Sequence, residues 1–220
     1  SREILLKGYP ELEGKNLNIP GDISSAAFLI VAAVITPGSD LTLKNIGINP
    51  LRVGLLDSLR EMGANITIHN VKNSINEPSA DIHVVHSPLN GVVIPSSRAP
   101  MMIDEYPILS IAASVAEGET SFEGIGELRV KESDRLKAIS EGLEVCGIKT
   151  HTTKTSLRIF GRGSPPSGNG LVHSYLDHRI AMSFLILGLV SDNPIKIDDE
   201  SSIKTSFPNL EIDARLVIFS

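Results

Sequence analysis

The segment from Glu127 to Arg135, with the sequence ELRVKESDR, is unusually dense in charge. If it is helical, its two cations Lys131 and Arg135 are four residues apart and share one face. Such residue types can bind an anion and exchange a proton beside it. A solvated helix start has the same composition, because the helix dipole favours Glu132 and Asp134 there and Arg135 can pair with them. Spacing alone leaves both interpretations open.

Three aspartates, Asp22, Asp104 and Asp177, each stand before a run of apolar and small residues long enough for a helix. Aspartate is a preferred N-cap, so we expect each to cap the helix that follows. After the third aspartate, His178 and Arg179 are unusual companions for an apolar helix. They are candidates for a site, although capping by Asp177 explains the start of this helix equally well.

The three segments belong to an internal repeat. Each apolar run is followed by a stretch typical of a strand, and a second helix is expected at a closely matching distance from the aspartate. The strand-like stretches are LTLKNI from Leu41, TSFEGI from Thr120 and IKIDD from Ile195, and the second helices are expected to start at Pro50, Glu132 and Ser206. A further pair of strands closes the first two copies, ANITIHN with DIHVVHS and IKTHTT with SLRIFG.

The second helices are apolar on one side only, which is typical of a helix lying on a core. The stripe comprises Leu51, Leu55, Leu59 and Met62 in the first copy and Leu136, Ile139, Leu143 and Cys146 in the second. Gly63 and Gly147 follow where C-caps belong.

The first helix of each copy is instead apolar nearly all round, as in a helix without a solvent face. The strands alternate, which suits sheets with one wet face. We therefore predict an α/β fold that inverts the usual layering, an inside-out prism with three sheets around a bundle of buried helices. Approximate threefold symmetry would place the three helix N-termini at one end, where their dipoles favour an anion.

Composition excludes several classes of protein. The net charge of −6 over 220 residues argues against nucleic-acid binding. A single cysteine, Cys146, rules out a disulfide framework and a cluster of thiols for zinc, and it suits a reducing cytoplasm. The longest apolar run, Ala26 to Ile35, falls short of the roughly 20 residues needed to span a membrane, and no secretory signal precedes it. We expect a cytoplasmic protein with neither nucleic acid nor membrane as a partner.

Four segments, PGDISSAAF from Pro20, LRVKESDR from Leu128, LDHRIAM from Leu176 and KTSFP from Lys204, resemble the signature motifs of EPSP synthases, in the family order. The similarity runs from about Gly8 to about Asn209. In that family two lobes, each of three βαβαββ units, close over the substrates, and the similarity covers only the C-terminal lobe. It implies that residues 1–220 form one lobe with repeats at about 20–95, 100–163 and 170–220, while 1–19 cross over from the N-terminal lobe.

The resemblance also implies a reaction, in which the 5-hydroxyl of shikimate 3-phosphate attacks phosphoenolpyruvate and phosphate then leaves. No cofactor or metal is expected. Asp104 matches the group that takes the hydroxyl proton, and Lys131 and Glu132 match the pair beside the reacting carbon, with Glu132 as the candidate acid. Arg135 and Arg179 match the residues that bind phosphoenolpyruvate, and His178 matches a neighbour that orients it. Some members carry a lysine two residues before the Phe-Pro pair, but this chain has Thr205 at that position and its lysine, Lys204, comes one residue earlier.

Two alternatives remain at this level. A UDP-N-acetylglucosamine enolpyruvyl transferase has the same architecture, but most of those enzymes need a reactive cysteine, whereas Cys146 lies in an apolar stripe where a thiol is inert. A noncatalytic binding or scaffold module could also keep the three repeats. The ending from Leu216 to Ser220 departs from the family pattern.

Overall fold

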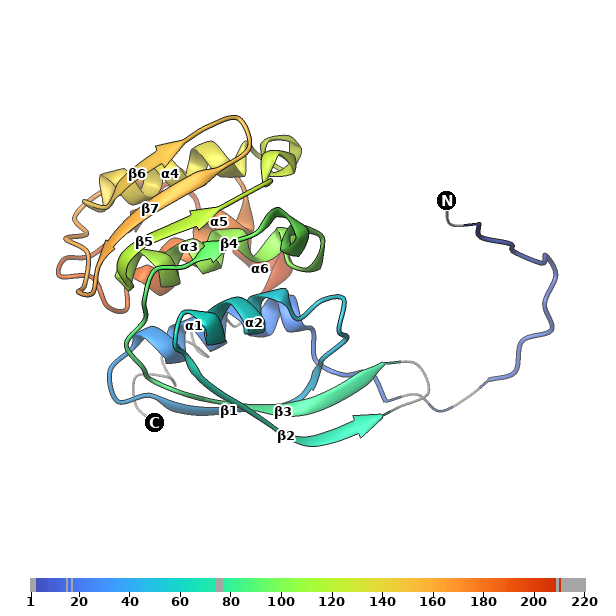
Figure 1. The fold of residues 1–220 in the computed structure, drawn as a ribbon. Coiled ribbons are helices and arrows are strands. Elements are labelled where there is room, and N and C mark those ends of the chain that lie inside the picture. The colour runs from blue at the N-terminus through green and yellow to red at the C-terminus, as the bar shows by residue number, and fades with distance from the viewer. Residues whose placement is uncertain (1–2, 15, 17, 74–76, 209, 211–220) are drawn as a thin grey trace.

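A computed structural model of the chain describes residues 3–14, 16, 18–73, 77–208 and 210 (Figure 1). The ending from Leu216 to Ser220, which departs from the family pattern, lies outside the described residues. The α-helices are α1 (Ile23–Ile35), α2 (Gly54–Glu61), α3 (Tyr106–Val115), α4 (Arg135–Val145), α5 (His178–Leu187) and α6 (Ile203–Ser206). The strands are β1 (Asp40–Gly47), β2 (Asn65–Asn73), β3 (Pro78–Val85), β4 (Val93–Ile94), β5 (Glu117–Phe122), β6 (Lys149–Thr152), β7 (Leu157–Arg162), β8 (Leu171–Val172) and β9 (Lys196–Ile197). Short 3₁₀ helices cover Ser96–Met101, Ile103–Glu105 and Gly126–Val130.

The described strands form three separate sheets, one for each repeat. Their strand orders are β1-β3-β2, β4-β5-β7-β6 and β8-β9. In the second and third repeats, a short strand before the buried helix pairs in parallel with the strand after it, β4 with β5 and β8 with β9. The first repeat keeps the same connection as a single parallel bridge between Gly21 and Ile46. The strand-helix-strand part of the repeat is thus shared by all three copies, even where its first strand is reduced to one residue, whereas the closing strand pair is described only in the first two.

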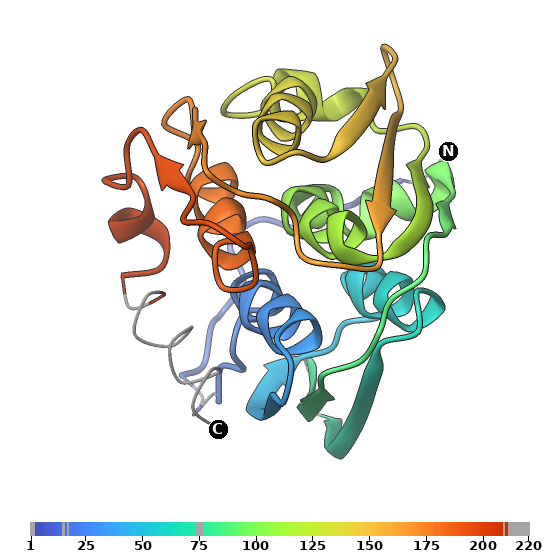
Figure 2. The ribbon, with the colours of Figure 1, turned by 90° about the vertical axis from the view of Figure 1, so that its left-hand side faces the viewer.

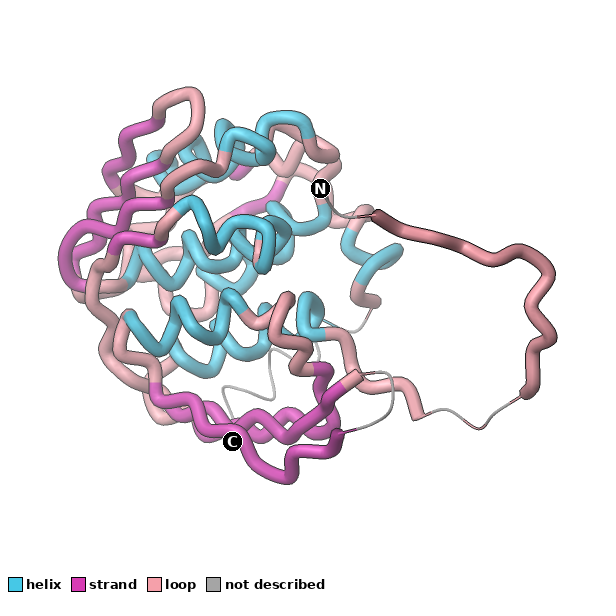
Figure 3. Tube along the Cα trace, turned by 45° about the vertical axis from the view of Figure 1, so that its right-hand side comes forward, coloured by secondary structure: helices cyan, strands magenta, loops and turns pink. Residues whose placement is uncertain are grey.

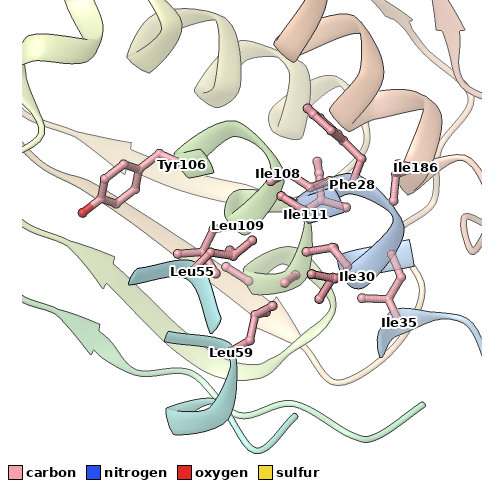
Figure 4. Close-up of a cluster of buried hydrophobic side chains, with 14 of the residues drawn as sticks. Phe28, Ile30, Ile35, Leu55, Leu59, Tyr106, Ile108, Leu109, Ile111 and Ile186 are labelled. Carbon is pink, nitrogen blue, oxygen red and sulfur yellow. The ribbon is translucent and has the colours of Figure 1, made fainter. Parts of the chain in front are cut away.

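Helices α1, α3 and α5 form the centre of the molecule and pack against one another, with the sheets outside them (Figures 2 and 3). Their side chains make one continuous apolar core. Figure 4 shows members of this core, among them Phe28 and Ile30 of α1, Ile108 and Ile111 of α3 and Ile186 of α5. The predicted inside-out prism is confirmed, because helices without a solvent face must be enclosed by other elements.

The packing of α4 on α5 depends on a glycine. A Cβ at Gly142 in α4 would overlap the ring of Phe184 in α5, so a larger residue would push the two helices apart. The expected positive φ angles at Gly63 and Gly147 are also present, 102° and 86°, directly after the C-caps of α2 and α4.

Several predicted boundaries are wrong. Helices α2 and α4 start at Gly54 and Arg135, later than Pro50 and Glu132, and Ser206 ends α6 instead of opening it. Leu51 lies before α2 and is exposed, so it is not part of the buried stripe. Turns or bends occupy the residues before each second helix, and the 3.6-residue periodicity does not reveal where such a turn becomes a helix.

The described residues before Pro20 form an extended arm that leaves the body of the protein (Figures 1 and 3). Its apolar side chains are almost fully exposed, namely Ile4, Leu5, Leu6, Tyr9, Leu12 and Ile19. Among the described residues, no helix is both long and apolar enough to cross a membrane.

Candidate active site

The N-terminal ends of α1, α3 and α5 meet on one side of the helix bundle, which we call the N-terminal rim. Two contacts join them: Ser24 of α1 donates a hydrogen bond to Glu105, one residue before α3, and Arg179 of α5 donates to the carbonyl oxygen of Asp104 at 3.2 Å. The predicted convergence of these three helix starts is therefore present. Asp22 and Asp177 cap α1 and α5 as expected.

Asp104 does not cap α3, so that prediction is wrong. It lies in the 3₁₀ helix Ile103–Glu105, and α3 begins at Tyr106 without a side-chain cap. Its carboxylate is instead 2.9 Å from Nη1 of Arg135 and 3.3 Å from Nζ of Lys131. Burial alone would raise the pKa of Asp104, but the charges of Arg179, Lys131 and Arg135 outweigh it and hold the pKa below the usual 3.8. The group is ionised at neutral pH and can accept a hydrogen bond or a proton from a hydroxyl.

Arg135 lies at the centre of the cluster of charged side chains at the N-terminal rim, and its own side chain is 0% exposed. Its Nε donates to Asp177 at 2.8 Å and its Nη1 to Asp104, while Nη2 lies 2.7 Å from the carboxylate of Glu132. A buried guanidinium is tolerated only when its donors are paired in this way. A bound anion could reach Arg135 only by displacing a carboxylate, and Glu132 is the one of these three that is most exposed, at 54%.

Asp177 combines the roles of cap and counter-ion. It accepts from the N–H of Arg179 at 3.0 Å and from the hydroxyl of Ser133 at 3.0 Å, besides Arg135. Burial opposes its charge, but Arg135 and these hydrogen bonds lower its pKa below the usual 3.8. The carboxylate therefore ties the charged turn before α4 to the start of α5.

The charged turn from Lys131 to Asp134 is not helical, so the prediction that Lys131 and Arg135 share one helix face is wrong. The 3₁₀ helix Gly126–Val130 ends before Lys131, which is extended, and Asp134 caps α4. Arg129 holds this turn by donating to the carbonyl oxygens of Thr153 at 2.6 Å and Lys154 at 3.1 Å. Both Lys131 and Arg135 nevertheless reach Asp104, because the turn brings them together without helical spacing.

The remaining predicted residues lie in different places. His178 is the first residue of α5, and burial is the main cause that lowers its pKa below 6.5, so the imidazole is neutral at pH 7. Lys204 is exposed on α6, and no hydrogen bond or ion pair described for the rim involves it. The structure thus brings six of the seven predicted residues to the rim and leaves Lys204 outside its bonded network.

Several residues of the cluster were not predicted as site residues. They are Ser24, Arg52, Glu105, Arg129, Ser133 and Asp177. One signal was present in the sequence: Glu105 is a second carboxylate directly before an apolar run, where a charge is costly. The backbone contacts of Arg129 follow from tertiary structure, and no local pattern indicates them.

Comparisons with known proteins show which family the chain resembles. The family model for EPSP synthase (3-phosphoshikimate 1-carboxyvinyltransferase) matches residues 1–213. The 3-phosphoshikimate 1-carboxyvinyltransferases of Paramagnetospirillum magneticum and Chelativorans sp. are 50% and 53% identical to the chain, over 94% of it and 46% of their own length. The chain spans about half the length of these curated relatives.

Solved structures show the same relation. An EPSP synthase from Acinetobacter baumannii superimposes with a TM-score of 0.90 at 43% identity, over 94% of this chain and 48% of its own. The enolpyruvyl transferase NikO from Streptomyces tendae shares the fold, with a TM-score of 0.68 at 20% identity over 89% of this chain and 42% of its own. With the family model covering nearly the whole sequence, the chain belongs to the EPSP synthase family.

Proposed function

We propose that this chain is one lobe of an enzyme that transfers the enolpyruvyl group of phosphoenolpyruvate to the 5-hydroxyl of shikimate 3-phosphate. The observation that carries the proposal is the meeting of Asp104, Lys131, Glu132 and Arg179 at the N-terminal rim, from three separate segments. The substrates are inferred from membership of the family. The rim contains an ionised proton acceptor, Asp104, a second carboxyl group, Glu132, and the cations Lys131 and Arg179. The whole chain acts as a single lobe of three repeats, with 1–19 as the crossover, and its location is cytoplasmic.

In the proposed reaction, Asp104 takes the proton of the attacking hydroxyl while Glu132 protonates the methylene carbon of phosphoenolpyruvate. The hydroxyl oxygen bonds to the middle carbon and gives a tetrahedral phosphate ketal. A proton then leaves the former methylene carbon as phosphate departs, which yields the enolpyruvyl ether. Arg179 and Lys131 offset the negative charge of the donor. Stabilisation of charge by fixed groups of this kind is usually the largest single contribution to lowering the barrier of such a step.

The donor also has to reach Arg135. That residue is fully buried and already paired with three carboxylates, so we propose that the donor replaces Glu132 beside Nη2. The exchange would free Glu132 to serve as an acid next to the reacting carbon. His178, neutral at pH 7, would orient the donor, and Lys204 could take part only if the second lobe draws α6 towards the rim.

The cations at the rim are matched by carboxylates within this lobe. Tight binding of two anionic substrates therefore needs further cations from the N-terminal lobe, and catalysis needs two walls around the reactants. We expect the chain alone to be folded but inactive.

The experiment mixes the chain with a separately produced N-terminal lobe of the same family and measures phosphate release. Activity is expected in the mixture and not with the chain alone. Arg179→Ala should weaken binding of phosphoenolpyruvate at least about tenfold, because an ion-paired anion loses its cation. Arg158→Ala is the matched control, since that arginine pairs with Glu119 on an outer sheet.

Three outcomes would contradict the proposal. No turnover from a well-formed complex favours a noncatalytic scaffold, and unchanged donor affinity removes Arg179 from the site. Activity with UDP-N-acetylglucosamine as acceptor would favour the alternative transferase. Burial raises the pKa of Cys146 to about 11, so the thiol cannot serve as the reactive group found in most of those enzymes.

A further inference from the structure

Glu105 is a buried carboxylate to which the proposed reaction gives no role. It is 5% exposed and lies between Asp104 and the first residue of α3. Burial raises its pKa, although the hydroxyl of Ser24 and the charge of Arg179 act in the opposite direction. A glutamine would accept the same hydroxyl hydrogen bond without the cost of burying a charge. The charge itself therefore calls for an explanation.

The contacts of Glu105 form a directed chain across the three repeats. Nη2 of Arg52, in the first repeat, donates to the hydroxyl of Ser24 at 3.0 Å, and this hydroxyl donates to Glu105. Glu105, in the second repeat, lies 3.8 Å from Nη1 of Arg179 in the third. The same Nη1 donates to the carbonyl oxygen of Asp104. The guanidinium of Arg179 is thus held from one side by two adjacent residues.

We propose that Glu105 is a positioning residue for Arg179, and that Ser24 and Arg52 make the first repeat part of the device that holds this arginine. The inference rests on the proposed function, in which Arg179 binds the enolpyruvyl donor. A long arginine side chain loses conformational entropy when it is ordered. If an ion pair already orders Arg179 in the free protein, donor binding no longer includes that entropy cost. The first repeat, to which no site residue is otherwise assigned, acquires a role through this contact.

The direction in which Glu105→Gln changes the KM for the donor distinguishes a positioning role of Glu105 from a purely electrostatic one. If Glu105 only adds negative charge beside Arg179, then Glu105→Gln should strengthen binding of an anionic donor and lower its KM. If Glu105 holds the guanidinium in place, the same substitution should raise the KM. A purely structural role predicts no change in KM at all.

The experiment uses the chain combined with its N-terminal lobe and measures kcat and KM for phosphoenolpyruvate. Glu105→Gln is expected to raise the KM roughly fivefold or more with a smaller change in kcat. Ser24→Ala should raise the KM in the same direction, and the double variant should resemble Glu105→Gln, because both changes break one chain of contacts. Ser25→Ala is the matched control, since its hydroxyl bonds to Asp22 and not to Glu105.

A stability measurement on the chain itself completes the test. Because folding raises the pKa of Glu105, its ionised form opposes folding, and Glu105→Gln should melt at or above the wild-type temperature at pH 7. This difference should shrink below pH 4.5, where the wild-type carboxyl is protonated. The charges that face Glu105 are Asp104 on its own 3₁₀ helix, Arg179 on α5 and Arg52 before α2.

An unchanged or lowered KM in Glu105→Gln, with the wild-type mixture active, would overturn the inference and leave the proposed function intact. Additive effects of Ser24→Ala and Glu105→Gln would overturn the chain of contacts. An inactive wild-type mixture would be a failure of the proposed function instead. If Glu105→Gln does not fold, the claim that its charge opposes folding is wrong, and Ser24→Ala, which keeps the charge, still tests the positioning role.

Discussion

The first and second repeats each bring an arginine beside the aspartate that precedes the buried helix, but the two pairs have different surroundings. In the second repeat Arg135 is 0% exposed and lies 2.9 Å from Asp104. In the first repeat Arg52 is 56% exposed and lies 3.4 Å from Asp22. The repeat places both pairs at corresponding positions, before or at the start of the second helix.

What distinguishes the pairs is the neighbouring repeat. Arg135 also contacts Asp177, a buried carboxylate from the third repeat, whereas Arg52 lines a pocket of about 250 Å³ that includes Gly21, Asn49 and Glu77. Burial strengthens the attraction within a pair and makes the loss of one partner far more costly. The equivalent pair is therefore buried only where a carboxylate from a neighbouring repeat also contacts the arginine.

The largest predicted effect follows from removing the buried arginine. Arg135→Ala leaves Asp177 buried without its cation, so we expect the free energy of unfolding to fall by about 3–5 kcal/mol. Urea unfolding of the chain measures this, with Arg158→Ala, whose ion pair is exposed, as the control. A loss below about 1 kcal/mol, typical of a surface pair, would end the distinction between the two repeats.

Removing the buried carboxylate should have a smaller effect, because Arg135 keeps Asp104 and Glu132. Asp177→Asn is expected to cost about 1.5–3 kcal/mol at pH 7, as for lost hydrogen bonds to a charged group. The pKa of Asp177 is lower in the folded protein than its usual 3.8. Its charge therefore contributes stability above pH 3.8, and that contribution is lost as the pH falls through the folded-state pKa.

Urea unfolding between pH 7 and pH 3 checks this prediction. The wild type should lose stability at the acid end of the range, and Asp177→Asn should lose less, because its side chain does not titrate. Equal pH dependence in both proteins would show that Asp177 is not ionised against Arg135 in the folded state. The same measurement on Asp22→Asn gives the exposed counterpart from the first repeat.

Much of this architecture could be predicted from hydrophobic pattern. The runs after Asp22, Asp104 and Asp177 are apolar nearly all round, and a helix of that kind has only one stable place, inside the protein. The convergence of the helix starts then follows from repetition. The start of α4 could not be predicted in this way, because the turn before it is held by Arg129 on the carbonyl oxygens of Thr153 and Lys154.

The site was predicted less completely than the fold. Resemblance to the family indicated seven candidate residues, Asp104 among them, but it did not indicate that Arg135 would be wholly enclosed by carboxylates. Asp104 was expected to be a cap, and it became a counter-ion because three cations from other segments approach it. Interactions between distant segments decide such roles, and neither periodicity nor capping preference contains that information.

The smallest predicted effect belongs to the exposed pair. Arg52→Ala removes a guanidinium that is mostly solvated, so the free energy of unfolding should change by about 0–1 kcal/mol. Urea unfolding in low and high salt measures it, and the small difference from wild type should shrink further in high salt because ions screen an exposed pair. Arg52→Lys is the matched control, since it keeps the charge. A loss approaching that of Arg135→Ala would mean that the position in the repeat, and not burial by the third repeat, determines how much these arginines stabilise the fold.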